Sequence, residues 1–172
     1  MAHTRTMAFL MILCTFTPVF AQPKPEAGKV QGKLTIDGKT FHLQFVYAGI
    51  YQSINYENKT VTHILIFLSD QKLPDALRQT PKESDAIDAL RDPARTEKAH
   101  FVALRVDSEN KILMETVIYD DNLYEEGFSE PLTVVTMTKN LAKAKFSSTG
   151  KKAKYQYDAE FEVNVAPLKA AK

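Results

Sequence analysis

Apolar and polar side chains alternate along most of this 172-residue chain with the two-residue period that is typical of β-strands. In residues 152–165, every second residue from Tyr155 to Val165 is apolar, and charged or amide side chains stand between them. One face of that strand is therefore expected to be buried and the other to be wet. Strands are also predicted in residues 29–36, 39–47, 60–68, 99–106, 111–119, 132–138 and 141–146.

Two details of the pattern indicate how these strands are arranged. Asp37-Gly38 stands between the first two, and an Asp-Gly pair is a strong hairpin signal because glycine adopts a positive φ without strain. Residues 60–68 are apolar on both faces from Ile64 onward, which predicts a central strand that is covered on both sides. Residues 47–58 lose the alternation, and we interpret them as an exposed connection.

One segment, residues 73–91, breaks the β pattern, because alanine and charged residues replace the β-branched ones. Thr80 is expected to cap a helix there, and Pro81 suits its first turn. Pro93 is expected to end it. The helix is predicted to cover an open end or an edge of the sheet, or one face of the central strand.

Together these elements predict a mainly β fold, either an antiparallel β-sandwich or a partly open barrel of about eight strands with one helical insert. The pattern does not decide between the sandwich and the barrel. Residues 30–166 are predicted to form a single β-rich domain. Residues 22–29 contain two prolines and are expected to form an extended leader, and residues 167–172 a flexible tail.

The first 21 residues have the three parts of a secretory signal peptide. Arg5 supplies the positive charge, residues 7–16 form a short apolar run, and Val19 and Ala21 precede a predicted cleavage before Gln22. The mature protein is therefore predicted to be exported, either periplasmic or secreted. The alternatives are an uncleaved membrane anchor, for which the run is short, and a lipoprotein.

The lipoprotein alternative would use Cys14, but Leu13 precedes it where a small residue is required, and Cys14 lies inside the apolar run. Cys14 is also the only cysteine, so cleavage leaves no disulfide and no thiolate chemistry. No later apolar run approaches the roughly 20 residues that cross a bilayer, so no transmembrane segment is predicted after cleavage.

The charges are nearly balanced, with 22 basic and 21 acidic residues. A neutral domain lacks the basic face that nucleic acid requires, so nucleic acid is not expected as a partner. The remaining partner classes are an unknown protein, a glycan or a small ligand.

Three short motifs resemble those of a scattered group of small exported bacterial β-rich proteins with no assigned activity. They are G-K-L-T-I-D-G-K in residues 32–39, L-S-D-x-x-L-P in residues 68–74 and Y-x-Y-D-A-x-F in residues 155–161. The resemblance covers most of residues 30–165 and implies an exported β-rich domain. It carries over no functional residues.

The mature chain holds three histidines, His42, His63 and His100, each in a predicted strand. None has the spacing of a zinc motif, so two partly buried, hydrogen-bonded histidines and one surface histidine are expected, with no metal and no cofactor. Residues 120–130 carry acids in adjacent pairs rather than in calcium-loop spacing, and we interpret them as a solvated loop. No serine lies in a nucleophile motif, so the catalytic residues stay unknown.

Tyr47, Tyr51 and Tyr56 are the candidate ligand-binding residues, because exposed tyrosines bury much area at low entropy cost. The alternative is that they pack over one end of the core. The leading functional hypothesis is an exported non-catalytic domain that binds a partner or ligand. The rivals are a small hydrolase or isomerase whose site assembles from scattered residues, and an envelope structural or assembly protein.

Overall fold

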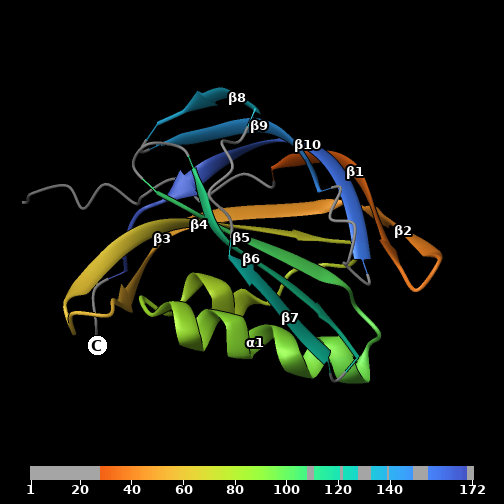
Figure 1. The fold of residues 1–172 in the computed structure, drawn as a ribbon, viewed down its shortest axis with the longest axis horizontal. Helices are drawn as coiled ribbons and strands as arrows, with labels where there is room; N and C mark the ends of the chain where they lie inside the picture. Colours follow the sequence, from red (N-terminus) through yellow and green to blue (C-terminus); the bar gives the residue numbers. More distant parts are fainter. Residues whose placement is uncertain are drawn as a thin grey trace, which may run out of the picture.

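A computed structural model describes residues 28–107, 111–120, 122–127, 133–138, 140–148 and 155–169. They form one mixed, mostly antiparallel sheet that does not close, with one α-helical insert, so the mainly β prediction is confirmed (Figure 1). The strands are β1 (Lys29–Ile36), β2 (Lys39–Leu43), β3 (Phe45–Ile54), β4 (Thr60–Ser69), β5 (Phe101–Val106), β6 (Ile112–Tyr119), β7 (Asn122–Gly127), β8 (Thr133–Met137), β9 (Leu141–Ser148) and β10 (Tyr155–Ala166). The helices are the short 3-10 helix η1 (Asp75–Arg78) and the α-helix α1 (Glu83–Thr96).

Strand β10 joins the two halves of the sheet. The main path runs β2-β1-β10-β3-β4-β5-β6-β7, and β9 and then β8 lie on the other side of β10. Most of β10 pairs antiparallel with β1 and β9, whereas Val165 and Ala166 pair in parallel with Ala48 and Gly49 of β3. The sheet is therefore continuous from β2 to β7 and folds back on itself at this junction.

The first core fills the space between the two halves. From β10 it receives the alternating apolar residues, such as Tyr157 and Phe161, and from β4 it receives Ile66 and Leu68. The charged residues between them on β10 are exposed, which confirms the predicted alternation of that strand.

The second core lies between the opposite face of β3–β6 and helix α1, which Figure 1 shows below the strands. Ala86, Leu90 and Ala94 of α1 pack with Phe67 of β4 and Phe101 of β5. Strand β4 is thus covered on both faces, as its sequence predicts. The helix covers a face of the sheet, and the expectation that it covers an open end or an edge is wrong.

The ends of α1 differ from the prediction. The helix begins at Glu83, and its N-cap residue Lys82 makes no side-chain capping bond. Thr80 instead accepts a hydrogen bond from the Lys82 backbone N–H at 3.1 Å and lies two residues before the N-cap position. Pro93 lies inside the last turn rather than ending the helix, because the following Ala94 is buried against the sheet.

Two predicted connections contain strands. Residues 47–58 do not form an exposed connection, because β3 runs to Ile54 and pairs with β4 along its whole length. Residues 120–130 are not a solvated loop throughout, because Asn122–Gly127 form β7 on the edge of β6. The single strand predicted for residues 39–47 is divided at Gln44, whose backbone N–H donates to the Ser69 carbonyl at 2.8 Å.

The hairpin between β1 and β2 turns at Asp37 and Gly38, whose φ angles are 48° and 79°. Both central residues have positive φ, as in a type I′ turn, which confirms the hairpin prediction. No helix in the described part of the chain is long and apolar enough to cross a membrane. The predicted signal peptide and residues 22–27 of the predicted leader lie outside the described residues.

Candidate functional site

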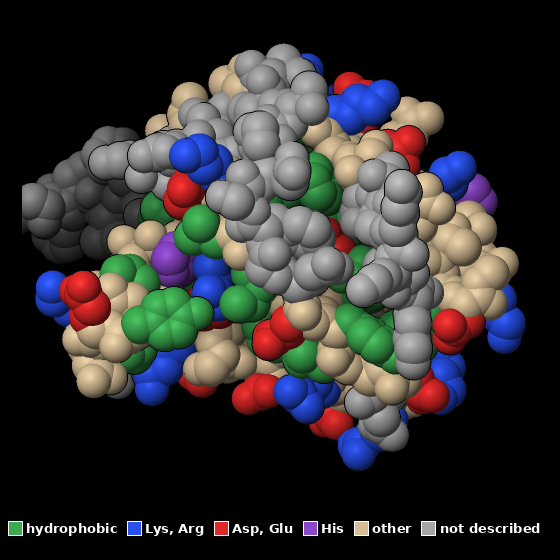
Figure 2. Space-filling view, viewed as in Figure 1, with side chains coloured by type: hydrophobic (Ala, Val, Ile, Leu, Met, Phe, Trp, Pro, Cys, Tyr) green, Lys and Arg blue, Asp and Glu red, His purple; other side chains and the backbone are tan. Residues whose placement is uncertain are grey.

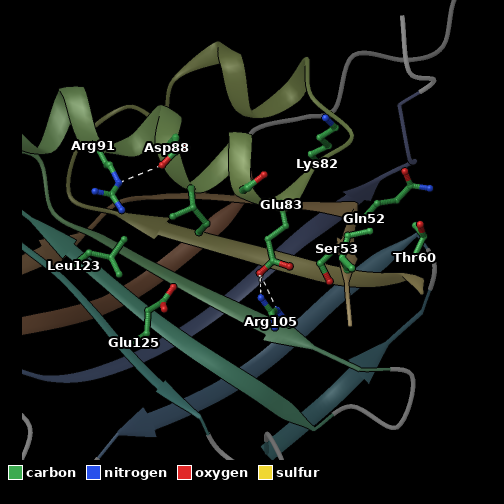
Figure 3. A pocket seen from close by; sticks show the side chains of 13 residues that line it. Gln52, Ser53, Thr60, Lys82, Glu83, Asp88, Arg91, Arg105, Leu123 and Glu125 are labelled. Carbon is green, nitrogen blue, oxygen red and sulfur yellow. Dashed lines mark hydrogen bonds and ion pairs between the residues drawn. The ribbon is translucent and has the colours of Figure 1, made fainter. Parts of the chain in front are cut away.

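A cleft of about 780 Å³ opens beside the N-terminus of α1. Figure 3 shows its two walls, with Gln52, Ser53 and Thr60 on one side and Leu123 and Glu125 on the other. Glu83 descends from the helix and meets Arg105 between these walls. The other residues that line the cleft are Ile54, Lys82, Ser84, Ile87, Asp88 and Arg91.

Strand register places a group of polar side chains on the α1 side of the sheet. Ser53 follows Tyr51 by two residues on β3, and Arg105 follows Ala103 by two residues on β5, so each shares the face of a residue in the second core. His63 of β4 pairs directly with Tyr51. The face that is apolar beneath the middle of the helix therefore becomes polar at the end near the helix N-terminus.

Glu83 and Arg105 form the ion pair at the floor of the cleft. Arg105 Nε donates to Glu83 Oε1 at 2.7 Å, and Arg105 Nη2 donates to the same oxygen. The Glu83 side chain is only 9% exposed, and that of Arg105 23%. Because Glu83 is also the first residue of α1, the partial positive charge of the helix N-terminus favours its carboxylate.

The second carboxylate oxygen of Glu83 has no hydrogen-bond partner within the described ranges of the chain. Oε2 is buried and accepts no hydrogen bond from any described residue, although it belongs to a cleft-lining side chain. A buried acceptor that stays unsatisfied costs about 1–3 kcal/mol. Glu83 lines the cleft, so a donor that reaches Oε2 from there would remove this cost.

Ser53, which lines the cleft, forms a second polar pair with His63 behind it. Ser53 Oγ and His63 Nε2 lie 2.8 Å apart and share a hydrogen bond. Burial lowers the pKa of His63, the positive charge of Arg105 lowers it further, and Glu83 and Asp107 oppose this in part. The imidazole is therefore neutral near pH 7, which allows it to accept a proton.

The rim of the cleft carries charges of both signs. Asp88 and Arg91 form an exposed ion pair at 3.2 Å. Exposed Lys82 and Glu125 make no ion pair with any residue that the structure describes. Figure 2 shows Lys and Arg interspersed with Asp and Glu along the lower part of this face, over α1 and the neighbouring strands. The electrostatic field around the cleft thus has no single sign.

The three candidate tyrosines do not form one surface. Tyr47 and Tyr51 are buried in the second core, where Tyr51 Oη donates to the Leu77 carbonyl at 2.5 Å and the Arg78 guanidinium lies 4.9 Å from the centre of the Tyr47 ring. Burial raises the pKa of both phenols. Tyr56 is fully exposed in the β3–β4 turn. The alternative of packing over the core thus describes Tyr47 and Tyr51, and ligand binding stays a prediction with only Tyr56 open to a partner.

The histidines occupy separate places. His100 Nδ1 lies 2.7 Å from Asp70 Oδ2, and its ring stacks on Phe41 with the ring centroids 3.5 Å apart. His42 is exposed on β2, whereas His63 and His100 are partly buried and hydrogen-bonded, which confirms the expected division. Among the described residues, no cluster of three or more His, Cys, Asp or Glu side chains is arranged to hold a metal ion.

The sequence pattern did not indicate Ser53, Glu83 and Arg105, which line the cleft, or His63, which is hydrogen-bonded to Ser53. Ser53, His63 and Arg105 are polar residues on a sheet face that is otherwise apolar. They lie near the C-terminal ends of β3 and β5 and the N-terminal end of β4, which the antiparallel pairing brings together. These polar residues in apolar strands were the only sign of the site in the sequence. They could be interpreted only with the knowledge that β3, β4 and β5 are neighbours. Glu83 lies inside the predicted helical segment of residues 73–91, and nothing in its sequence position indicates a partner on β5.

Fold and site together define the class of this protein, an open, mostly antiparallel β domain with a helix on one face and a polar cleft at the helix N-terminus. Comparison with protein-family models, with curated proteins and with solved structures finds no match to the chain.

Proposed function

We propose that this domain binds a small polar ligand in the cleft beside the N-terminus of α1. The observation that carries the proposal is the buried Glu83 carboxylate, which holds Arg105 with one oxygen, while the other has no donor among the described residues. The cavity of about 780 Å³ is within the range of small-molecule sites. A small ligand is therefore favoured over the protein and glycan alternatives.

The lining defines the chemistry of the ligand. Because Arg105 already compensates the charge of Glu83, the group that meets Oε2 is a neutral hydroxyl or amide N–H rather than a second cation. Ile87 and Leu123 offer aliphatic contacts for a non-polar portion of the ligand. The balanced charges on the rim favour an uncharged or zwitterionic molecule.

Export is part of the proposal. The predicted signal peptide and the resemblance to exported bacterial proteins support a periplasmic or secreted ligand-binding domain. Fractionation of cells that produce the full chain, with mass determination of the recovered protein, tests this. A protein that starts at Gln22 outside the cytoplasm supports export, and an intact cytoplasmic protein contradicts it.

The binding proposal is tested by screening ¹⁵N-labelled protein against small compounds that carry hydroxyl or amide groups. We expect ligands that shift the amide signals of Ser53, Glu83 and Arg105. Glu83→Gln replaces the free acceptor with an N–H donor of the same shape and should weaken binding at least tenfold.

Asp88→Asn removes an exposed carboxylate at the rim and is the matched control. It should change affinity by less than a factor of three, since exposed ion pairs contribute about 0–1 kcal/mol. Ligands whose affinity is the same in wild type and in Glu83→Gln would contradict the proposal.

A further inference from the structure

We infer that Ser53 is a nucleophile in this cleft and that the protein hydrolyses small carboxylic esters through an acyl-serine. The inference rests on the proposed ligand cleft, because the ester has to occupy it. Of the rival hypotheses that the sequence left open, this inference favours the hydrolase. The residues that it assigns to catalysis lie on the neighbouring strands β3, β4 and β5.

The nucleophile and its base are already in contact. A serine hydroxyl is a weak nucleophile until a neighbouring base takes its proton, and the working separation is about 2.6–3.2 Å. Ser53 Oγ and His63 Nε2 are 2.8 Å apart. Ser53 also lines the cleft, so its hydroxyl is accessible to a bound ester rather than enclosed in the core.

The protonation state of His63 suits a general base. Its burial and the charge of Arg105 lower its pKa, so the ring is neutral at the pH at which a proton has to be accepted. Glu83 and Asp107 act in the opposite sense, and they stabilise the imidazolium once it forms. The contact between Ser53 and His63 supplies the proton-transfer geometry, and Glu83 and Asp107 act on the imidazolium through their charge alone.

Arg105 supplies positive charge for the oxyanion. Its Nε and Nη2 groups are held by Glu83, while Nη1 makes no hydrogen bond within the described part of the chain. Arg105 lines the same cleft as Ser53. A guanidinium fixed by a carboxylate is a preorganised donor for charge that develops on a carbonyl oxygen.

The reaction balances with water as the only co-reactant. The Ser53 hydroxyl proton passes to His63 Nε2 while Oγ bonds to the ester carbonyl carbon. The carbon–oxygen bond to the alcohol then breaks, and the departing alcohol takes the proton from His63. Water next adds to the acyl carbon and gives one proton to His63. The Oγ–carbon bond then breaks, Oγ takes that proton back from His63, and the carboxylic acid is released with the Ser53 hydroxyl restored.

The test uses p-nitrophenyl acetate as substrate and a fluorophosphonate as covalent probe. We expect p-nitrophenol release and a single adduct that peptide mapping locates at Ser53. Ser53→Ala should abolish the adduct, and His63→Gln should slow labelling at least 100-fold, the range of general base catalysis. Arg105→Lys keeps the charge but loses the fork geometry, and should slow turnover at least tenfold.

Ser147→Ala is the matched control, because Ser147 is an exposed serine on β9 that bonds to Asp158 outside the cleft. Its labelling rate should equal that of wild type. Circular dichroism of every variant separates loss of chemistry from loss of fold.

The two proposals fail in distinguishable ways. Ligand binding that depends on Glu83, with no adduct at Ser53, overturns the nucleophile and leaves the binding proposal intact. An adduct on another residue, or one that persists in Ser53→Ala, also overturns it. Absence of both binding and labelling overturns both proposals.

Discussion

Glu83 combines two conflicting demands at one residue. Its carboxylate neutralises Arg105 in a poorly hydrated place, yet one of its oxygens is buried and receives no hydrogen bond from the part of the chain that the structure describes. Buried polar groups in folded proteins are nearly always hydrogen-bonded, and an exception calls for an explanation such as a bound water, an ion or a catalytic role. The residue therefore connects the stability of the domain to its proposed function.

Removal of the Glu83 side chain should destabilise the domain, because Arg105 is left partly buried without its counter-ion. We expect Glu83→Ala to lower the free energy of unfolding by roughly 2–3 kcal/mol, somewhat less than for a fully enclosed pair. Urea denaturation measures it. Asp88→Ala, which breaks an exposed ion pair, should cost less than about 1 kcal/mol. Equal losses in the two variants would show that the Glu83–Arg105 pair is not buried in solution.

His63 should make stability depend on pH in a defined direction. An unfolded histidine has a pKa of about 6.5, and burial together with Arg105 lowers the pKa in the folded state. Above pH 6.5 both states are neutral and His63 adds no pH dependence. As the pH falls below 6.5, the unfolded chain takes up the proton first, so stability decreases until the folded pKa is reached.

The measurement is urea denaturation of wild type and His63→Gln at pH 7.5 and pH 5.5. The variant should lose less stability between the two conditions than wild type does. His42→Gln removes an exposed histidine and controls for the loss of one imidazole. Parallel losses in wild type and His63→Gln would contradict the prediction.

The residues of the site could not be predicted from the sequence, because their contacts are made only in the folded protein. Ser53 and His63 are ten positions apart, and Glu83 and Arg105 are 22 apart, so neither pair has a motif spacing. Only the register of β3 on β4, and the docking of α1 on the sheet, bring these side chains together. The sequence identified the tyrosines as candidates because they are aromatic. Whether each is exposed depends on strand pairing and on the docking of α1, which the sequence did not specify.

Among the elements, the β1–β2 hairpin has the clearest local cause. Gly38 has a φ of 79°, and a β-carbon added there would meet no atom within 4 Å. Gly38→Ala should therefore cost only the conformational strain, about 1 kcal/mol in urea denaturation. Gly38→Asn should cost less, because asparagine adopts positive φ more readily. An alanine variant as stable as wild type would mean that the turn adopts another conformation.

A strand could be predicted from the sequence where one of its faces is buried and the other is exposed to solvent. Strand β3 was recognised only in part, and β7 was not recognised. The alternation of β10 follows from one buried and one exposed face. Strand β3 lost its signal because Val46, Tyr47 and Ala48 are all buried, so no polar residue separates its two faces. Strand β7 resembled a loop because it lies at the end of the strand order and brings Glu125 to the cleft. The sequence predicted the helix but not its ends. No side chain caps its N-terminus, and its C-terminal turn extends past Pro93 because Ala94 is buried.

The molecule as a whole depends on contacts between the ends of the chain. Strand β10 lies between β1 and β9 and also reaches β3. Across the first core, Tyr157 Oη donates to Glu115 Oε2 at 2.5 Å, which links β10 to β6 in the other half of the sheet. The sequence indicated that β10 has a buried face, but it carried no information on which strands flank it.

This arrangement predicts a sharp difference between two truncations. A chain that ends before Tyr155 loses the strand between β1 and β9 and exposes the first core, since Tyr157 and Phe161 each fill it. We expect no cooperative unfolding transition in urea. A chain that ends at Ala166 keeps every β10 pairing and should match wild type within about 0.5 kcal/mol, as is usual for surface changes. If the shorter chain still unfolded cooperatively, β3–β7 with α1 would be an independent folding unit, and β10 would be an addition to it rather than the strand that completes the fold.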